Sequence, residues 1–397
     1  MAIDERDVFL QVPLKRLAKF RSGGAIDNQR ISDEGKFPVY GGNGIRGYTS
    51  ESNIHGHNLL VGRQGALSGN VHRVIGPIWA SEHALIASLS TLINFDFAYY
   101  LLQNMNLNQY SQAAAQPGIS ASVIQAVTTH IPKEISEQRA IAEFLDTKTA
   151  DIDGLIEKMA REVQLLERYR RELIAHTVTR GLNPDVPMKD SGIDWIGETP
   201  STWKTASISL VTDENRAKNA DLSEKNLLSL SYGQIIRKDI DLAFGLLPAS
   251  FDSYQIVEPG YIILRMTDLQ NDKRSLRSGL ARERGIITSA YIGLKVREPI
   301  VSEYLAWLLR FYDLAKVFYS LGGGVRQSAS YKEIGKIPIL VPPMEEQQKI
   351  ADFLEEKSAQ IDSSIEGIKR QIELLGKYRK QVINDAVTGK VRVGEVA

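Results

Sequence analysis

The sequence predicts a mixed α+β protein in which two globular α/β domains are separated by two long helices, packed as an antiparallel coiled coil in a pseudo-two-fold repeat. The first observation behind this prediction is a stretch of 46 residues that occurs twice without a gap, at 137–182 and 346–391, with 20 identical positions. The second is the coiled-coil spacing of apolar residues in both copies. The third is that each copy follows a segment rich in glycine, asparagine and short apolar runs, which is typical of strands joined by turns.

The composition limits the class of protein. A chain of 397 residues, 43% of them apolar, exceeds one ordinary domain, so several structural units are expected. The absence of cysteine excludes disulfides and thiolate metal sites, and it fits a reducing compartment. No apolar run reaches the length of a membrane span, and the N-terminus has no apolar signal core. We therefore expect a soluble cytoplasmic protein.

The two predicted domains end in the same way. A short helix, starting near Tyr99 in the first domain and near Tyr304 in the second, is followed by a glycine-containing loop and by Ile-Pro before the long helix. Apart from this shared frame, the domains show little mutual similarity. The predicted bounds are 1–132 for the first domain, 133–182 for the first long helix, 183–198 for a linker rich in Pro, Gly and Asp, 199–341 for the second domain, 342–390 for the second long helix and 391–397 for a tail.

Both long stretches have apolar residues mostly at intervals of four and three, with no proline between start and end. A helix of about 45 residues is roughly 65–70 Å long, which suits a spacer better than a piece of core. A plain packing role, holding two domains together, is part of the same prediction. The expected seam comprises Ile152, Ile156, Met159, Val163 and Leu166 in the first helix and Ile361, Ile365, Ile368, Ile372 and Leu375 in the second.

Two seam positions are polar in both copies. They are Lys148 with Lys357, and Arg170 with Arg379. At these positions we expect the seam to be interrupted by water, by carboxylates of a partner or by pairs that set the register.

A glycine-rich stretch at Gly42–Gly47 satisfies the spacing G-x-G-x-x-G after a possible strand. A dinucleotide-binding fingerprint also requires a helix after the third glycine, but a turn-like and strand-like sequence follows here. The stretch is better explained as a hairpin loop, or as a turn that brings Asn43 and Arg46 close to a ligand.

No catalytic or metal-binding motif is visible. The six histidines include no H-E-x-x-H arrangement, so surface or turn positions are expected for them and no metal site is predicted. The spacing of a phosphate-binding loop and of a serine nucleophile elbow are both absent. The sequence therefore favours a binding protein over an enzyme.

Basic and amide side chains between the predicted strands are the candidate binding residues. Residues 261–297 carry eight Lys/Arg against three Asp/Glu, although the whole chain has no net charge. Arginine can bond bidentately to guanine and glutamine to adenine, and most protein–DNA hydrogen bonds go to phosphates. For each candidate, a solvated surface residue is the alternative. The candidate DNA-contacting residues are Asn43, Arg46, Arg63, Gln64, Arg73, Arg265, Lys273, Arg274, Arg277, Arg326 and Gln327.

Three sequence marks carry a resemblance to a known family. They are IPKEISEQRAIAEFLDTKTADID with ERYRRELI, IPILVPPMEEQQKIADFLEEKSAQID with GKYRKQVI, and the mid-chain DSGIDWIGETPSTWK. In this order, which covers nearly the whole chain, they resemble the specificity subunit of type I restriction–modification systems. One departure is that Lys133-Glu134 stand where the second copy has Pro342-Pro343.

The resemblance implies a non-catalytic reader of double-stranded DNA. Each variable domain would read one half of a split target, and the long helices would set the gap and bind two methyltransferase subunits. S-adenosylmethionine, ATP and Mg are then expected on methyltransferase and restriction subunits, with no cofactor bound by this chain.

Two other classes of function stay open at this point. One is a coiled-coil scaffold that organises protein partners without reading DNA. The other is an enzyme that uses Gly42–Gly47. The duplicated frame with divergent domains, together with the basic clusters, favours the DNA reader.

Overall fold

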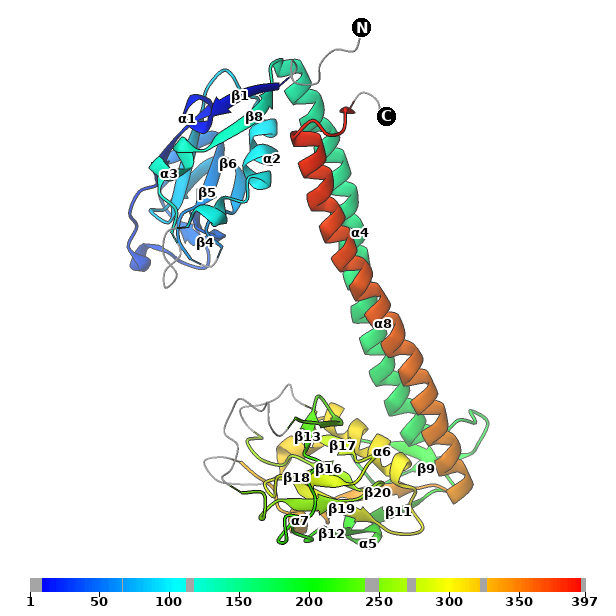
Figure 1. Ribbon diagram of the computed structural model, residues 1–397. Helices are drawn as coiled ribbons and strands as arrows, with labels where there is room; N and C mark the ends of the chain where they lie inside the picture. Colours follow the sequence, from blue (N-terminus) through cyan, green and yellow to red (C-terminus); the bar gives the residue numbers. More distant parts are fainter. Residues whose placement is uncertain are drawn as a thin grey trace. The chain divides into compact units, whose positions relative to one another are not determined.

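The computed structural model describes residues 9–65, 67–111, 118–239, 250–269, 276–321 and 327–393 (Figure 1). The chain forms two compact units, one made of Met1–Ala160 with Lys369–Ala397 and the other of Arg161–Ile368. Each unit therefore contains one sheet domain and a part of both long helices. Within the described ranges, no helix is both long and apolar enough to cross a membrane.

The first unit is built around a six-stranded sheet, in which neighbouring strands are antiparallel except for the parallel pair β3 and β6. Consecutive residues Leu59, Leu60 and Val61 of the inner strand β5 are fully buried, so both faces of the sheet are covered there. The strand order is β2 (Ala18–Ser22), β7 (Ala84–Leu89), β5 (Ile54–Gly62), β6 (Val71–Ala80), β3 (Phe37–Gly41) and β4 (Gly44–Thr49).

Short helices and a second strand pair complete the first domain. The helix predicted near Tyr99 is present and begins at Phe95, because the Asn94 side chain accepts the backbone N–H groups of Asp96 and Phe97. The elements are β1 (Phe9–Pro13), paired antiparallel with β8 (Thr128–Pro132), the helices α1 (Leu14–Leu17), α2 (Phe95–Asn104) and α3 (Ala121–Ala126), and the 3-10 turns η2 (Asn28–Arg30) and η3 (Leu107–Tyr110).

The second unit has a smaller, four-stranded antiparallel sheet in the order β12 (Thr212–Glu214), β19 (Ile292–Val296), β16 (Ile262–Leu264) and β17 (Ser278–Leu280). Three antiparallel pairs surround it: β11 (Lys204–Ser207) with β20 (Pro338–Val341), β13 (Leu228–Ser231) with β14 (Gln234–Arg237), and β15 (Gln255–Val257) with β18 (Gly285–Ile287). Its helical elements are α5 (Ile208–Val211), α6 (Ser302–Leu314), η4 (Val317–Ser320) and α7 (Tyr331–Ile334).

The same frame is present in both domains. Strand pairs β1–β8 and β11–β20 each join the first strand of a domain to the strand that leads into a long helix. Each domain also has three helices in the same order along the chain, α1, α2 and α3 in the first and α5, α6 and α7 in the second. The sheets inside this frame differ, since one has six strands and the other has four.

The stretch at 183–198 is more than the predicted linker. Its strand β9 (Met188–Asp190) pairs antiparallel with β10 (Glu198–Pro200). Ile193 is buried in the core of the second unit together with Trp203, and the Trp195 ring packs edge-on against Tyr312 at a centroid distance of 5.9 Å. Apolar side chains within a Pro- and Gly-rich sequence therefore fasten this segment to the second domain.

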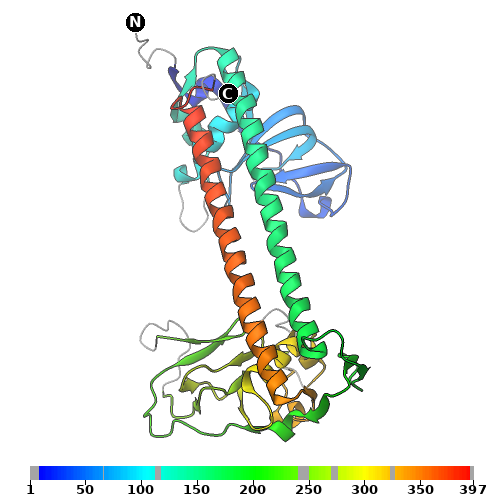
Figure 2. The same cartoon turned by 90° about the vertical axis from the view of Figure 1, so that its right-hand side faces the viewer.

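The long helices are α4 (Ile135–Arg180) and α8 (Met344–Val387), and parts of both lie side by side in each unit (Figures 1 and 2). In the first unit, the start of α4 runs antiparallel to the end of α8. Ile141 and Leu145 there share the core of the domain with Ile383. The helix ends are therefore parts of the domain core, whereas the sequence favours a spacer over a piece of core.

The second unit repeats this arrangement with the other two helix ends. Ile174 near the end of α4 packs in one core with Ile350 and Leu354 near the start of α8. The predicted mixed α+β class, with two sheet domains and long helices, is confirmed.

The predicted seam residues have graded burial. Val163, Ile361 and Ile365 form a small apolar cluster in the second unit, with exposed fractions of 6 to 8%. Ile152 in the first unit is 5% exposed. The half-buried seam residues are Ile156, Met159, Leu166, Ile368, Ile372 and Leu375.

Candidate nucleic-acid interface

The turn between β3 and β4 lies against the residues that follow β5. A Cβ atom added at Gly62 would lie 2.1 Å from the carbonyl oxygen of Gly42, and one added at Gly42 would lie 2.7 Å from the carbonyl oxygen of Gln64. Only glycine permits such close backbone approach. The structure therefore brings together two predicted sites, Asn43 in one loop and Arg63 with Gln64 in the other, which we call the first-domain loop cluster.

The first-domain loop cluster presents polar side chains. Gln64 is exposed, and its Oε1 lies 2.7 Å from Nδ1 of His83. The half-buried Arg63 donates a hydrogen bond of 2.9 Å to Ser22 Oγ, and Asn43 is exposed. Amide and guanidinium groups at the ends of sheet strands are suited to bond base edges or phosphates.

The glycine-rich stretch forms a hairpin, as one of the sequence interpretations predicts. Its third glycine, Gly47, lies within β4, and the next element along the chain is strand β5. The helix N-terminus that a dinucleotide site needs is therefore not formed by this stretch. Arg46 is exposed, and its guanidinium donates to Oδ1 of Asn28 at 3.1 Å.

Arg73 joins the first domain to its long helix, which corrects its prediction as a DNA contact. Its guanidinium pairs with Asp96 of α2 at 3.0 Å and with Asp146 of α4 at 2.9 Å. It also lies over the Tyr99 ring, 4.4 Å from the centroid. These contacts use both the charge and the planar face of the side chain. We therefore remove Arg73 from the candidate DNA contacts.

The contact between the first domain and α4 contains an ionised carboxylate. Burial raises the pKa of Asp146, but hydrogen bonds from Arg73 and Tyr100 outweigh this effect and hold the pKa below its usual range. The Tyr100 hydroxyl donates to Asp146 at 2.7 Å, and burial raises the pKa of Tyr100 to about 12. At neutral pH the carboxyl group is charged and the phenol is not.

Arg277 in the second domain is also a structural residue, contrary to its prediction. Its side chain is fully buried, and its guanidinium donates to the carbonyl oxygens of Arg265, Thr267 and Asp268 at 3.1, 2.8 and 3.2 Å. An arginine that closes a loop through three carbonyl groups does not present its donors to DNA. We remove it from the candidates as well.

The remaining candidates of the second domain have different placements. Arg265 is half-buried in the loop that Arg277 closes. Gln327 is half-buried, and its side-chain amide donates to the carbonyl oxygen of Leu321 at 2.7 Å. Three candidates lie outside the described residues: Lys273, Arg274 and Arg326.

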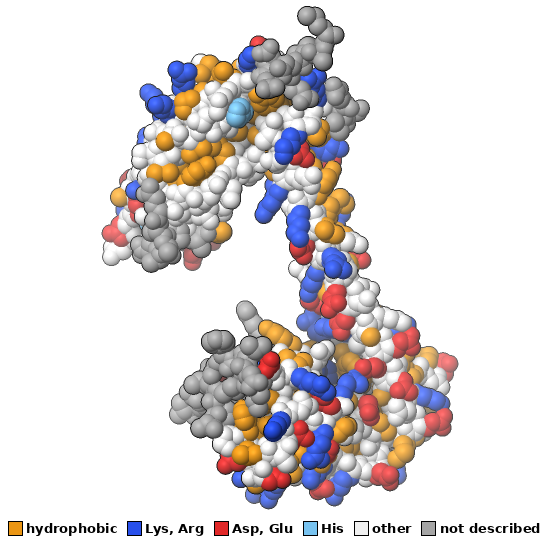
Figure 3. All heavy atoms as spheres, viewed as in Figure 1, with side chains coloured by type: hydrophobic (Ala, Val, Ile, Leu, Met, Phe, Trp, Pro, Cys, Tyr) orange, Lys and Arg blue, Asp and Glu red, His pale blue; other side chains and the backbone are white. Residues whose placement is uncertain are grey.

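Ion pairs neutralise part of the basic surplus at 261–297. Arg282 pairs with Glu355 at 2.6 Å, and Arg284 pairs with Glu224 at 3.0 Å. Figure 3 shows acidic and basic side chains interspersed on the second domain. A charge count over one segment misses this neutralisation, because the acidic partners come from other parts of the chain.

Two ion pairs cross the helix seam, one in each unit. Arg170 pairs with Asp362 in the second unit, and Arg379 pairs with Asp153 at 2.8 Å in the first. Each residue of one pair is 209 positions from its counterpart in the other pair. The sequence left water, carboxylates of a partner or register-setting pairs as possibilities at these two arginines. The structure has ion pairs between the two helices, which suit the setting of a register. The sequence interpretation missed the aspartates, although they are identical in both copies.

The two seam lysines are not part of such pairs. The Lys148 ammonium lies 5.9 Å from the centre of the Phe144 ring. Lys357 donates to the Gln360 side chain at 3.1 Å on its own helix. These positions therefore differ between the copies.

A buried glutamine fastens the start of each long helix to its domain. Gln138 donates to the carbonyl oxygen of Pro132 at 2.9 Å and accepts the backbone N–H of Asn94 at 2.7 Å. Gln347 accepts the backbone N–H of Val301 at 2.8 Å. Sequence reasoning did not single out these residues, and the only signal was the Glu-Gln shared by the two copies.

Each unit exposes a leucine and a tyrosine at equivalent places on a long helix. Leu165 and Tyr169 on α4 are 47% and 53% exposed, and Leu374 and Tyr378 on α8 are 56% and 54% exposed. Residues four apart are neighbours on one helix face. We call each pair a leucine–tyrosine patch. The internal repeat thus produces two copies of one apolar surface.

The helical frame is duplicated, the two sheet domains differ, and polar loops lie at strand ends. These features define a recognition protein. The family comparison gives this class a name. The chain belongs to the type I restriction modification DNA specificity domain family, whose model matches residues 9–165 and 288–374, more than half of the chain.

Curated relatives carry the same description. The specificity subunit of the type I restriction enzyme EcoprrI from Escherichia coli is 42% identical, but over only 34% of each chain. A putative type I specificity subunit, MjaX, from Methanocaldococcus jannaschii is 24% identical over 74% of this chain and 68% of its own length. For the putative subunit S.HindORF215P of Haemophilus influenzae, the identity is 22% over 88% of both chains.

Two solved structures share the fold at low identity. A chain from a study of complex assembly and conformational transition of the type I R-M system has a TM-score of 0.68 at 13% identity, with 97% of this chain and 98% of that chain covered. The HsdS subunit of Thermoanaerobacter tengcongensis has a TM-score of 0.51 at 13% identity, with 96% and 97% covered.

Proposed function

We propose that the two domains of this specificity subunit each read one half of a bipartite DNA target. The observation that supports this most directly is the repeated frame around different contents. Both units have a glutamine that anchors the start of a long helix, and both have an arginine–aspartate pair across the seam. The sheets, in contrast, have six strands in one unit and four in the other. Reading two unrelated half-sites requires equivalent supports and different reading surfaces.

In this proposal the long helices set the separation of the half-sites. The ends of helices α4 and α8 belong to the domain cores. The seam pairs Arg170–Asp362 and Arg379–Asp153 favour one register of the two helices, because a slip would separate both pairs.

The leucine–tyrosine patches support docking of two methyltransferase subunits. Tyrosine is enriched among residues that dominate binding energy, and a monomer gains nothing by keeping it exposed. Because the two patches are copies of one surface, they suit two copies of one partner. We assign one methyltransferase subunit to Leu165 with Tyr169 and one to Leu374 with Tyr378.

The chemistry of modification and cleavage belongs to the partners in this proposal. S-adenosylmethionine would bind to the methyltransferase subunits, and ATP and Mg would act with the restriction subunits. This chain would bind no cofactor of its own and would work in the cytoplasm, where the DNA of a prokaryotic cell lies.

The test is an exchange of the first domain. Residues 1–132 are replaced by the corresponding domain of another specificity subunit, and methylated adenines are mapped in a genome exposed to the assembled methyltransferase. We expect one half of the recognised sequence to change and the other half, with the gap, to stay. A contiguous site, or a change in both halves at once, contradicts the proposal. DNA binding that is absent or independent of salt favours the protein scaffold instead.

A further inference from the structure

The hairpin β13–β14 turns through a strained tyrosine. Its two central residues, Tyr232 and Gly233, have φ values of +45° and +79°, and strand pairing resumes at Ser231 and Gln234. Two-residue turns of this kind prefer Asn-Gly, because asparagine tolerates positive φ better than a bulky residue. The ring gains little from packing within the chain, since Tyr232 is 85% exposed.

Arg310 of α6 holds this turn from within the domain. Its guanidinium donates to the carbonyl oxygen of Gly233 and, at 2.7 Å, to that of Ser278. A Cβ atom at position 233 would lie only 1.8 Å from the guanidinium and would displace it, and the φ of +79° at this position also favours glycine. Arg310 is half-buried, and burial lowers the pKa of its guanidinium.

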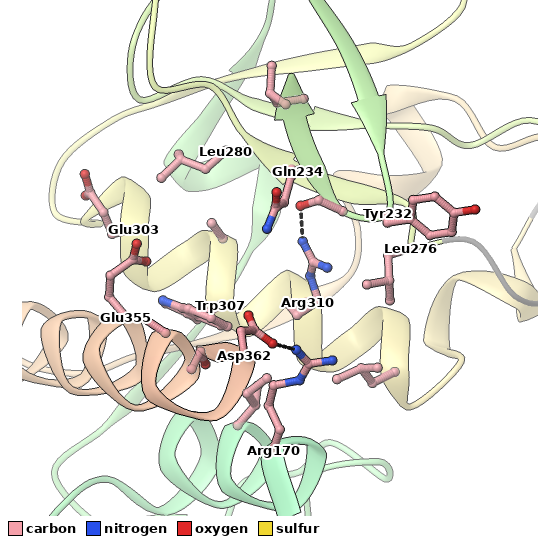
Figure 4. A pocket seen from close by; sticks show the side chains of 18 of the residues that line it. Arg170, Tyr232, Gln234, Leu276, Leu280, Glu303, Trp307, Arg310, Glu355 and Asp362 are labelled. Atoms are coloured by element: carbon pink, nitrogen blue, oxygen red, sulfur yellow. Dashed lines mark hydrogen bonds and ion pairs between the residues drawn. The ribbon is translucent and has the colours of Figure 1, made fainter. Parts of the chain in front are cut away.

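Tyr232 lies at the rim of a hollow of about 680 Å³ that is bordered by the hairpin, α6, α4 and α8 within the second unit. Figure 4 shows its ring pointing away from the hollow and from Arg310. A single exposed apolar side chain is ordinary on a protein surface. At this turn, a partly buried arginine holds a strained backbone, and the side chain that the turn presents is an exposed ring. Backbone strain of this kind is typical of a functional position.

We propose that Tyr232 contacts DNA in the second half-site, with its ring stacked on a base of the target. This inference rests on the function proposed above. In a duplex the faces of the bases are covered by their neighbours, so the ring would insert at a base step and partly unstack it. A ring fixed on a rigid turn loses little freedom when it does so. The exposed Gln234, directly after the turn, adds an amide that suits the edge of adenine.

The decisive variant is Tyr232→Asn, because it removes the ring and suits the turn better. Binding is measured for the full chain assembled with its methyltransferase subunits, on a duplex that carries the mapped target. We expect a thermal midpoint equal to or above that of wild type, and an affinity lowered about 5- to 150-fold, as for loss of one base stack. Tyr232→Phe, which keeps the ring, is expected to bind more tightly than Tyr232→Asn.

Leu222→Asn is the matched control. Leu222 is also in the second unit, with a φ of +56° and an exposed fraction of 48%, so the change relieves the same kind of strain without removing a proposed contact. We expect its DNA affinity to equal that of wild type. Equal binding by wild type and Tyr232→Asn overturns the inference and leaves the proposed function standing. A wild-type complex without sequence-dependent binding overturns both.

Discussion

Asp146 is a residue of α4 that bonds directly to two side chains of the first domain. It accepts hydrogen bonds from Arg73 at 2.9 Å and from Tyr100 at 2.7 Å, and Tyr100 is itself buried. The repeat counterpart of Asp146 is Glu355, which pairs with Arg282 of the second domain. The same helix position therefore bears an acidic anchor in both copies, although Arg73 lies in strand β6 and Arg282 lies in the loop between β17 and β18.

Replacement of Asp146 by asparagine gives a pH-dependent prediction. Because the folded pKa of Asp146 lies below the value of about 3.9 in an unfolded chain, the ionised form stabilises the fold fully above pH 4. That stabilisation is lost as pH falls through the lower, folded value. We expect Asp146→Asn to lower the free energy of unfolding by about 1 kcal/mol at pH 7, a figure reduced for partial exposure, and by less at pH 3.

Thermal unfolding of the full chain at a series of pH values measures this effect. Asp151→Asn is the control, since Asp151 is an exposed acid on the same helix. Its midpoint is expected to follow that of wild type at every pH. A gap between wild type and Asp146→Asn that is the same at pH 3 and pH 7 would show that the carboxylate charge is not what stabilises this contact.

At the scale of the element, each long helix has two different faces. One face packs along the seam and into the domain cores, and the other displays a leucine–tyrosine patch. The period of the sequence predicts the first face, because burial repeats every three to four residues. The second face is recognised only once exposure is known, since leucine and tyrosine also suit a seam.

Truncation of one patch tests the assignment of the methyltransferase subunits. We expect Leu374→Ala with Tyr378→Ala to remove one methyltransferase from the complex and Leu165→Ala with Tyr169→Ala to remove the other. Loss of a central tyrosine typically weakens an interface by about 2 kcal/mol or more, or roughly 30-fold. Native mass spectrometry of the assembled complex counts the subunits.

Leu155→Ala is the matched control for this experiment. Leu155 is 48% exposed on α4, but its repeat counterpart is Ser364, so it belongs to no duplicated surface. Two bound methyltransferase subunits are expected for this variant. If all four patch residues are replaced and two subunits still bind, the patches are not the docking sites.

For the molecule as a whole, the length of the helices is the quantity that the proposed function depends on. Met159 and Ile368 are repeat counterparts in α4 and α8. Insertion of one heptad after each of them keeps the apolar period and lengthens each helix by about 10 Å. Since ten base pairs span about 34 Å, we expect the gap between half-sites to grow by about three base pairs.

Mapping of methylated adenines reads out this change. The two half-sites themselves are expected to remain the same, because neither domain is altered. A complex that folds and methylates with an unchanged gap would contradict the role of the helices as the spacer. Insertion of a heptad in α4 alone is the control, and it is expected to disrupt assembly because the seam pairs lose their register.

The sequence by itself determined the frame of this protein. The long helices follow from apolar periodicity, which is a local property, and their duplication follows from a constant offset. The tertiary structure alone decided which polar residues are available to DNA. Arg63 and Arg277 are both arginines near strand ends, yet one lies in a surface loop cluster and the other is fully buried among carbonyl groups. Burial and pairing depend on partners distant in the chain, such as Asp146 for Arg73, and no local pattern encodes them.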